Sequence, residues 1–136
     1  MQDILRFMIV DDDPVSNFLT KTVISKTNLN AAVVAIENAE TALECLLDIS
    51  QELPNVILLD LNMPIMSGWE FIEAFSKSDY LMQASITLII LSASNNQRDI
   101  ERAKTYGFVR DYINKPLTVP ILENQFNSNY SGSKPG

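Results

Sequence analysis

Three carboxylates follow apolar runs of the sequence, at positions where buried strands are expected to end. Asp11 and Asp12 come directly after the run 5–10, and Asp60 comes after the run 55–59. Such continuous apolar runs are typical of strands buried on both faces of a parallel sheet. Carboxylates are rarely buried without a partner, and three that converge repel one another. A divalent cation would relieve this repulsion, and an all-oxygen site favours Mg²⁺ over zinc.

A hydroxyl and a lysine stand at the ends of two later runs. Ser92 follows the run 86–91 and has the right group to hydrogen-bond a phosphoryl oxygen, although turn and cap roles are commoner for a serine. Lys115 follows the run 109–113, and opposite carboxylates it is better interpreted as an anion clamp than as a solvated surface lysine. The next acid after the first pair, Asp13, precedes a proline, so we expect it to cap a helix.

The elements that must position these side chains alternate along the chain. Five apolar runs are separated by stretches in which apolar residues recur at helical spacing. This alternation predicts an α/β fold, a doubly wound five-stranded parallel sheet of the flavodoxin-like order 2-1-3-4-5 with helices on both faces. Ligands of such sheets bind at the carboxyl ends of the strands, here above the first and third. The expected strands are 5–10, 31–36, 55–59, 86–91 and 109–113, and the expected helices fall within 15–23, 39–47, 69–75, 100–107 and 117–126.

Composition excludes several classes of function. The formal net charge is −7, from 10 basic and 17 acidic residues, which argues against binding to nucleic acid or to anionic membranes. The lack of histidine excludes Ser-His and Cys-His nucleophile systems, histidine-ligated zinc and a phosphohistidine carrier within this chain. The lone Cys45 is interpreted as a small, partly buried hydrophobe. We expect one cytoplasmic domain over residues 1–127, no membrane span, and a flexible polar tail over 128–136.

The order of these residues along the chain resembles the receiver domain of two-component response regulators, in its single-domain, chemotaxis-regulator-like form. The resemblance covers about residues 5–126. Two departures are present: one extra residue separates Gly107 from Lys115, and Ser92 replaces the more frequent threonine. The residues that carry the resemblance are Asp11, Asp12, Asp60 within the segment 59–68, Ser92, Lys115 with Pro116, and Tyr112 at the aromatic switch position.

The resemblance implies a phosphorylation-activated switch with Mg²⁺ as its cofactor. Asp60 would accept a phosphoryl group from a phosphohistidine donor, and the charge added there would shift a two-state equilibrium. Tyr112 would then turn inward and alter a switch face, formed by the expected helix 100–107, strand 109–113 and helix 117–126. By resemblance, Mg²⁺ would be held by Asp60, Asp12 and the backbone carbonyl of Asn62. Asp11 would orient the site or act through water. The phosphoryl group would be held by Lys115, Ser92 and the backbone N–H of Ala93.

The implied partners are a histidine kinase or a histidine phosphotransfer protein as donor, and an output protein of unknown identity. A homodimer through the switch face is a further expectation. The chain would be a regulatory phosphoacceptor and not an enzyme with an external substrate, although it would catalyse its own phosphoryl transfer and slow autodephosphorylation. Two alternatives stay open. A hydrolase with an aspartyl nucleophile is disfavoured because Asn62 cannot act as the second acid, and a binding module without phosphorylation is disfavoured by the complete set of acids.

Overall fold

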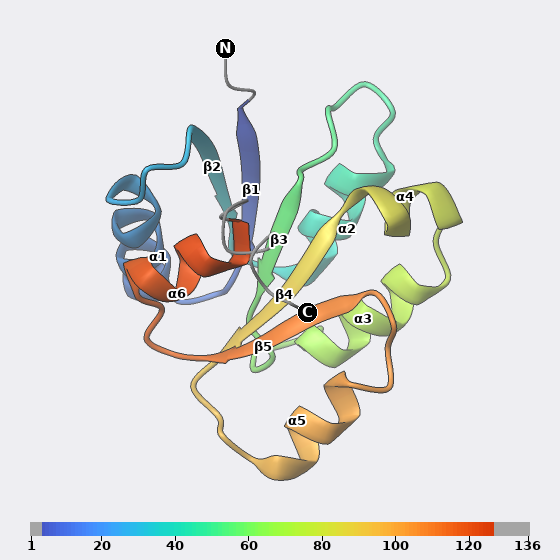
Figure 1. Cartoon of the computed structure of the whole chain (residues 1–136). Coiled ribbons are helices and arrows are strands. Elements are labelled where there is room, and N and C mark those ends of the chain that lie inside the picture. Colours follow the sequence, from blue (N-terminus) through green and yellow to red (C-terminus); the bar gives the residue numbers. More distant parts are fainter. Residues whose placement is uncertain (1–3, 127–136) are drawn as a thin grey trace, which may run out of the picture.

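A parallel sheet forms the centre of the protein, whose computed structural model describes residues 4–126 (Figure 1). Within this range the strands are β1 (Leu5–Val10), β2 (Ala31–Ile36), β3 (Val56–Leu59), β4 (Thr87–Ser92) and β5 (Val109–Asn114). Their order in the sheet is β2-β1-β3-β4-β5, and every neighbouring pair is parallel. The predicted doubly wound α/β fold is confirmed, with each strand within a residue of its expected bounds.

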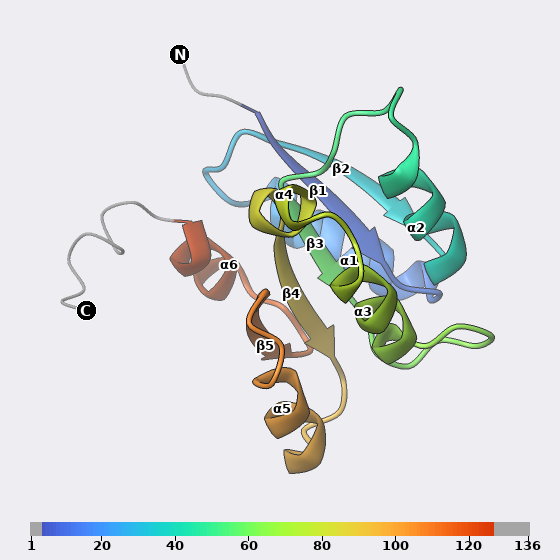
Figure 2. The ribbon, with the colours of Figure 1, turned by 90° about the vertical axis from the view of Figure 1, so that its right-hand side faces the viewer.

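Helices cover both faces of the sheet. Within residues 4–126 they are α1 (Pro14–Ser25), α2 (Ala39–Leu47), α3 (Gly68–Ser76), α4 (Tyr80–Ser85), α5 (Gln97–Ala103) and α6 (Val119–Phe126). Residues of α1 and α6 enter one core, and residues of α2, α3 and α5 enter the other. Figure 2 shows α6 and α3 on opposite sides of the sheet. The sequence pattern did not predict α4, whose 6 residues are too few to show a helical period.

Alternate residues of each strand enter two separate cores, because successive side chains of a strand point to opposite faces. On β3, Ile57 and Leu59 join the core with α2 and α3, whereas Val56 and Leu58 join the core with α1 and α6. All four side chains are at most 1% exposed. A strand buried on both faces has no place for an uncompensated charge, which is why Asp60 marks its end.

A β-bulge in β5 accounts for the extra residue that the sequence carries before Lys115. The register between β4 and β5 skips Arg110, which lies between the partners of Leu88 and Ile89. A bulge of this kind adds one residue to one strand and lets regular pairing resume beyond it. Pairing continues up to Ser92, so the insertion does not displace Lys115 from the carboxyl edge of the sheet.

Helix α1 exposes the first half of the apolar stripe that predicted it, whereas Val23 at its other end is partly buried. Val15, Phe18 and Leu19 are 66%, 68% and 56% exposed. The residues that α1 buries are Asn17, Thr20 and Ile24. Helical spacing predicted the helix correctly, but two of the three residues that it buries are polar. The exposed apolar residues form a surface that begins beside the carboxyl edge of the sheet.

Asp13 and Cys45 take the structural roles that the sequence predicts for them. The Asp13 side chain accepts a hydrogen bond from the N–H of Val15 at 3.0 Å and caps α1, as predicted. Cys45 is partly buried against the core, which also agrees with its interpretation. The expected polar tail, 128–136, lies outside the described residues. Among residues 4–126, no helix combines the length and the apolar character needed to cross a membrane.

Candidate functional site

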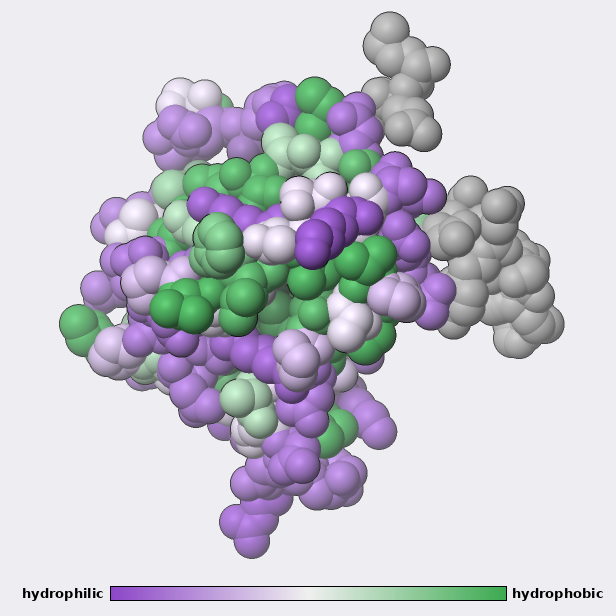
Figure 3. Space-filling model, turned by 90° about the vertical axis from the view of Figure 1, so that its left-hand side faces the viewer, coloured by the Kyte–Doolittle hydropathy of each residue, from purple (hydrophilic) through white to green (hydrophobic). Residues whose placement is uncertain are grey.

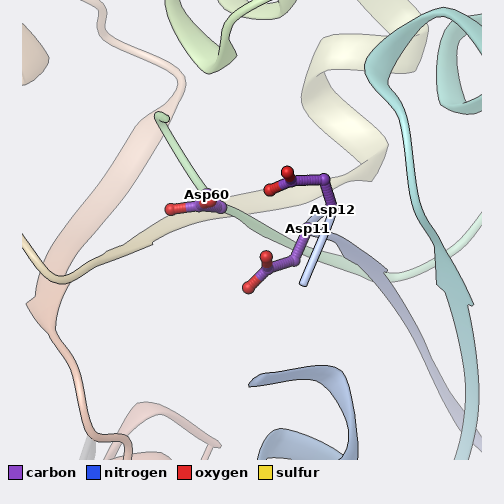
Figure 4. Close-up of side chains that lie close together, drawn as sticks. All are labelled: Asp11, Asp12 and Asp60. Carbon is purple, nitrogen blue, oxygen red and sulfur yellow. The ribbon is translucent and has the colours of Figure 1, made fainter. Parts of the chain in front are cut away.

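The three acids meet at the carboxyl edge of the sheet. β1 and β3 are neighbours, and the N–H of Asp60 donates to the carbonyl of Val10 at 2.9 Å. The residues that follow the two strands therefore lie side by side. Figure 4 shows the side chains of Asp11, Asp12 and Asp60 gathered at this point. One carboxylate oxygen from each lies within 4.8 Å of the others, so the predicted cluster is present.

Asp60 is the acid whose ionisation the protein opposes most. It is 7% exposed, and burial raises the pKa of its carboxyl from 3.8 to about 6. The charge of Lys115 and a backbone hydrogen bond from Asn62 oppose this rise in pKa. The charges of Asp11 and Asp12 add to it. At neutral pH the carboxylate is mostly ionised, but its charge is poorly compensated. A cation at this position would favour the ionised form.

Asp11 is held by hydrogen bonds from several parts of the protein. Its Oδ2 accepts from the Ser16 hydroxyl at 2.7 Å and from the Lys115 ammonium at 2.9 Å. Its Oδ1 accepts from the N–H of Asp13 at 3.0 Å, and its backbone carbonyl accepts from the Asn17 amide at 3.0 Å. A carboxylate with three donors is suited to orienting its neighbours rather than to binding a metal directly.

The other two acids offer the ligands that Mg²⁺ prefers. Asp12 is half-buried, and among residues 4–126 no hydrogen-bond donor contacts its carboxylate. Asp60 contributes a second carboxylate, and Asn62 is exposed in the loop that follows. Carboxylate and carbonyl oxygens next to open solvent suit a cation that keeps several of its waters. The donor set therefore fits the metal that the sequence indicates.

Lys115 reaches the cluster from the end of β5. Its Nζ lies 2.9 Å from Asp11 Oδ2 and 3.8 Å from Asp60 Oδ1, and its side chain is 21% exposed. Its backbone N–H donates to the carbonyl of Ser92 at 2.8 Å, which ties the ends of β4 and β5 together. An ammonium close to two acids can leave either of them for a new anion, and this is the geometry that an anion clamp requires.

The segment after β4 connects Ser92 to Tyr112 through one residue. Ser92 is 0% exposed, and its hydroxyl oxygen accepts from the N–H of Ser94 at 3.1 Å. The partly buried Tyr112 donates its hydroxyl to the carbonyl of Ser94 at 2.8 Å. Ala93, between the two serines, is exposed and lines a groove with Lys115. A change at Ser92 would thus reach Tyr112 through the backbone of Ser94.

The loop from β3 to α3 fits tightly against the backbone of Asp60. A Cβ atom on Gly68 would lie only 2.5 Å from the Asp60 carbonyl oxygen, so this position requires glycine. Within the loop the N–H of Met66 donates to the carbonyl of Pro64 at 2.7 Å. Ile65, the centre of this γ-turn, has a φ of 68°, which is a strained value for a β-branched residue.

Two residues of α1 that hold Asp11 were not predicted from the sequence. Ser16 and Asn17 lie in the first turns of α1, next to the acids along the chain. Asn17 is 5% exposed, and its Oδ1 lacks a hydrogen-bond partner among the described residues. The available signal was the pair of polar residues at the start of a helix that begins at the site. A polar residue there points equally well to solvent, so the pattern alone did not single them out.

The chain also matches a known family. The sequence model of the response regulator receiver domain matches residues 7–127, which include Asp11, Asp12, Asp60, Lys115 and Tyr112. The chain belongs to this family. A receiver domain is a regulatory phosphoacceptor of two-component signalling, and the acidic cluster of this receiver domain fits Mg²⁺ and an aspartyl phosphate.

Relatives with curated descriptions are longer than this receiver domain. The two-component response regulator ORR22 of Oryza sativa subsp. indica is 26% identical over 120 residues, which are 88% of this chain and 16% of that protein. The probable C4-dicarboxylate response regulator DctR of Halalkalibacterium halodurans is 26% identical over 122 residues, which are 90% of this chain and 50% of that protein. The chain thus spans half or less of the length of these relatives.

Solved structures match the receiver domain over most of their length. A two-component response regulator from Cytophaga hutchinsonii has a TM-score of 0.85 and 30% identity, covering 93% of this chain and 97% of that one. The phosphorylated cyanobacterial phytochrome response regulator RcpA has a TM-score of 0.78 and 25% identity, covering 93% of this chain and 96% of that one. At these TM-scores the two structures share the overall fold of this chain.

Proposed function

We propose that this receiver domain accepts a phosphoryl group on Asp60 from a phosphohistidine donor and then alters a surface that binds an output protein. The position of Asp60 carries the proposal. It is a buried carboxylate with a raised pKa, at the carboxyl edge of the sheet. Its nearest cation, the ammonium of Lys115, is 3.8 Å away and lies closer to Asp11. A carboxylate kept for stability alone would have its own partner. The related RcpA has been solved in a phosphorylated form, which supports phosphorylation of this chain.

In the transfer step, an oxygen of the Asp60 carboxylate attacks the phosphorus of the donor phosphohistidine. A P–O bond forms while the P–N bond breaks, and the electron pair of that bond returns to the imidazole nitrogen of the donor. The sequence contains no histidine, so the donor lies outside it. We assign it to a histidine kinase or a histidine phosphotransfer protein.

The residues around Asp60 would act by positioning and by neutralising charge. Lys115 would leave Asp11 to pair with one phosphoryl oxygen, while the Ser92 hydroxyl and the Ala93 N–H would donate to the others. Mg²⁺, held by Asp12, Asp60 and the Asn62 carbonyl, would supply compensating positive charge. The same arrangement would let a water molecule attack the phosphorus of the phosphorylated Asp60, which would permit slow autodephosphorylation.

Phosphorylation would be transmitted from Ser92 to Tyr112. It adds about 1.5 to 2 negative charges at Asp60. When the Ser92 hydroxyl turns to the new oxygens, the segment around Ser94 moves with it, and Tyr112 repacks inward. The switch face, which comprises α5, β5 and α6, then changes its surface. This is a two-state element biased by a local charge. A homodimer through this face and a cytoplasmic location remain predictions.

The exposed stripe of α1 is the surface we assign to the phosphodonor. Figure 3 shows apolar side chains gathered on the side of the molecule that carries α1, where Val15, Phe18 and Leu19 are more than half exposed. Val15 and Leu19 also line a groove of about 270 Å³, together with Ala93 and Lys115. A donor helix docked on the stripe would therefore have its histidine near the acid cluster. Exposed apolar patches at such positions mark protein contacts.

Transfer from two kinds of donor tests this proposal. With Mg²⁺, a phosphohistidine protein should label Phe18→Glu at least about tenfold more slowly than the wild type, because a charge replaces an apolar anchor of the interface. A small acyl phosphate should label both chains at the same rate, because it needs no docking surface. A chelator should stop labelling by both donors. The measurement is the phosphorylated fraction against time, followed by intact mass.

Leu81→Glu is the matched control for Phe18→Glu. Leu81 is 70% exposed on α4, away from the acids, and its replacement should leave both reactions unchanged. Equal labelling of Phe18→Glu and wild type by the phosphohistidine protein would show that the docking surface is wrong. Undiminished labelling in the presence of the chelator would remove Mg²⁺ from the proposal.

A further inference from the structure

The Ser16 hydroxyl occupies an unusual place among the serines and threonines of α1. It donates to Asp11 Oδ2 at 2.7 Å. Thr22 and Ser25 of the same helix instead donate to helix carbonyls, at 2.9 Å and 2.7 Å. The cap of α1 is Asp13, so Ser16 has no capping role. Its hydrogen bond is therefore directed at the acid cluster and not at the helix.

Ser16 and Lys115 share one oxygen of Asp11. Lys115 Nζ lies 2.9 Å from Asp11 Oδ2, the same atom that accepts from Ser16, and 3.8 Å from Asp60 Oδ1. The Asp11 side chain is 3% exposed, so little water can replace a lost donor. If Lys115 turned to an anion on Asp60, Asp11 would lose its only cation among the described residues but would keep the hydroxyl.

We propose that Ser16 is a positioning residue that lets Lys115 leave Asp11. By donating to Asp11 Oδ2, the hydroxyl compensates the buried carboxylate in part and lowers the free energy needed to withdraw the ammonium. Hydrogen bonds to ionised groups are stronger than those between neutral groups, and a buried acceptor left without a donor is costly. Ser16 would thus favour the state in which Lys115 contacts the phosphoryl group. This inference rests on the proposed phosphorylation of Asp60.

Binding of beryllofluoride, an inert mimic of the phosphoryl group, tests the role of Ser16 in the full chain. With saturating Mg²⁺, Ser16→Ala should bind beryllofluoride about tenfold more weakly than wild type, because Lys115 is then retained by Asp11. Ser16→Thr keeps a hydroxyl and should restore most of the affinity. Mg²⁺ alone should bind all variants equally, since Ser16 contacts Asp11 and not the proposed ligands. Fluorine NMR titrations give the affinity for beryllofluoride, and calorimetric titrations give the affinity for Mg²⁺.

Ser25→Ala is the matched control, because it removes a hydroxyl that also donates a hydrogen bond of 2.7 Å, but to a helix carbonyl at the far end of α1. It should bind beryllofluoride and Mg²⁺ like the wild type. Wild-type affinity in Ser16→Ala, a parallel loss of Mg²⁺ affinity, or no rescue by threonine would each overturn the inference. If the wild type itself failed to bind beryllofluoride with Mg²⁺, the proposed function would be wrong, and the proposed role of Ser16 would be wrong as well.

Discussion

Asp60→Asn should lose phosphoryl labelling by about 100-fold or more, whether the donor is a protein or a small acyl phosphate. The amide oxygen of asparagine is a poor nucleophile and forms no stable phosphoryl adduct. The neighbouring acids cannot take over, because Asp11 is tied by three donors and Asp12 lies on the outer side of the cluster. Intact mass after incubation with donor and Mg²⁺ measures the loss.

The same variant should be more stable than the wild type in the absence of Mg²⁺. The folded chain raises the pKa of Asp60 from 3.8 to about 6, so it binds this proton more tightly than the unfolded chain does. Stability from this group is therefore lost as pH rises from about 4 to 6, and the gain on mutation reaches about 2 kcal/mol near pH 7. Below pH 4 the difference should vanish. Unfolding thus cannot explain lost labelling.

Asp79→Asn provides the control for the change from acid to amide. Asp79 caps α4 by accepting from the N–H of Leu81, and asparagine caps a helix equally well. Labelling and stability should both stay close to wild type. Labelling of Asp60→Asn at the rate of this control would contradict the role of Asp60.

Gly68→Ala should destabilise the fold by about 3 kcal/mol or more. The new Cβ would lie 2.5 Å from the carbonyl oxygen of Asp60 and 2.6 Å from the Cα of Leu61. Both atoms belong to the backbone, which cannot rotate away as a side chain would. The start of α3 would have to move from the end of β3. Chemical denaturation measures the loss of stability, and labelling should fall with it because Asp60 itself shifts.

Gly107→Ala separates this close approach from the general effect of replacing a glycine. Nothing lies within 4 Å of a Cβ built on Gly107, and φ is not positive at either glycine. Its replacement should change the free energy of unfolding by less than about 0.5 kcal/mol. Similar losses in the two variants would mean that contact with the Asp60 backbone is not what excludes alanine at Gly68.

The strands and the acid cluster could be predicted from the sequence because each is determined by one simple physical requirement. A strand buried on both faces must be apolar throughout, so runs such as Val56–Leu59 identify it, and the first charge ends it. Parallel order then brings the ends of β1 and β3 together. The placement of Asp11, Asp12 and Asp60 follows from these two facts alone.

Other features depend on tertiary contacts that no local pattern encodes. The apolar stripe of α1 predicted a helix but not which face is buried, because Asn17 takes a core-facing position to bond the carbonyl of Asp11. Ser16 likewise looks like any polar residue near a helix start. The α4 helix is too short for a period to appear. The extra residue before Lys115 was visible, but only the pairing of β4 with β5 assigns it to Arg110.

The position of the phosphoryl group on the wild-type chain tests the central claim most directly. The chain is labelled with a small acyl phosphate and Mg²⁺, reduced with borohydride, digested and analysed by peptide mass spectrometry. Reduction converts a phosphorylated aspartate to homoserine and so marks the site permanently. Phosphorylation of Asp60 predicts homoserine at position 60, and only in the sample that received donor. Homoserine at position 11 or 12, or none in a chain that carries the label, would contradict it.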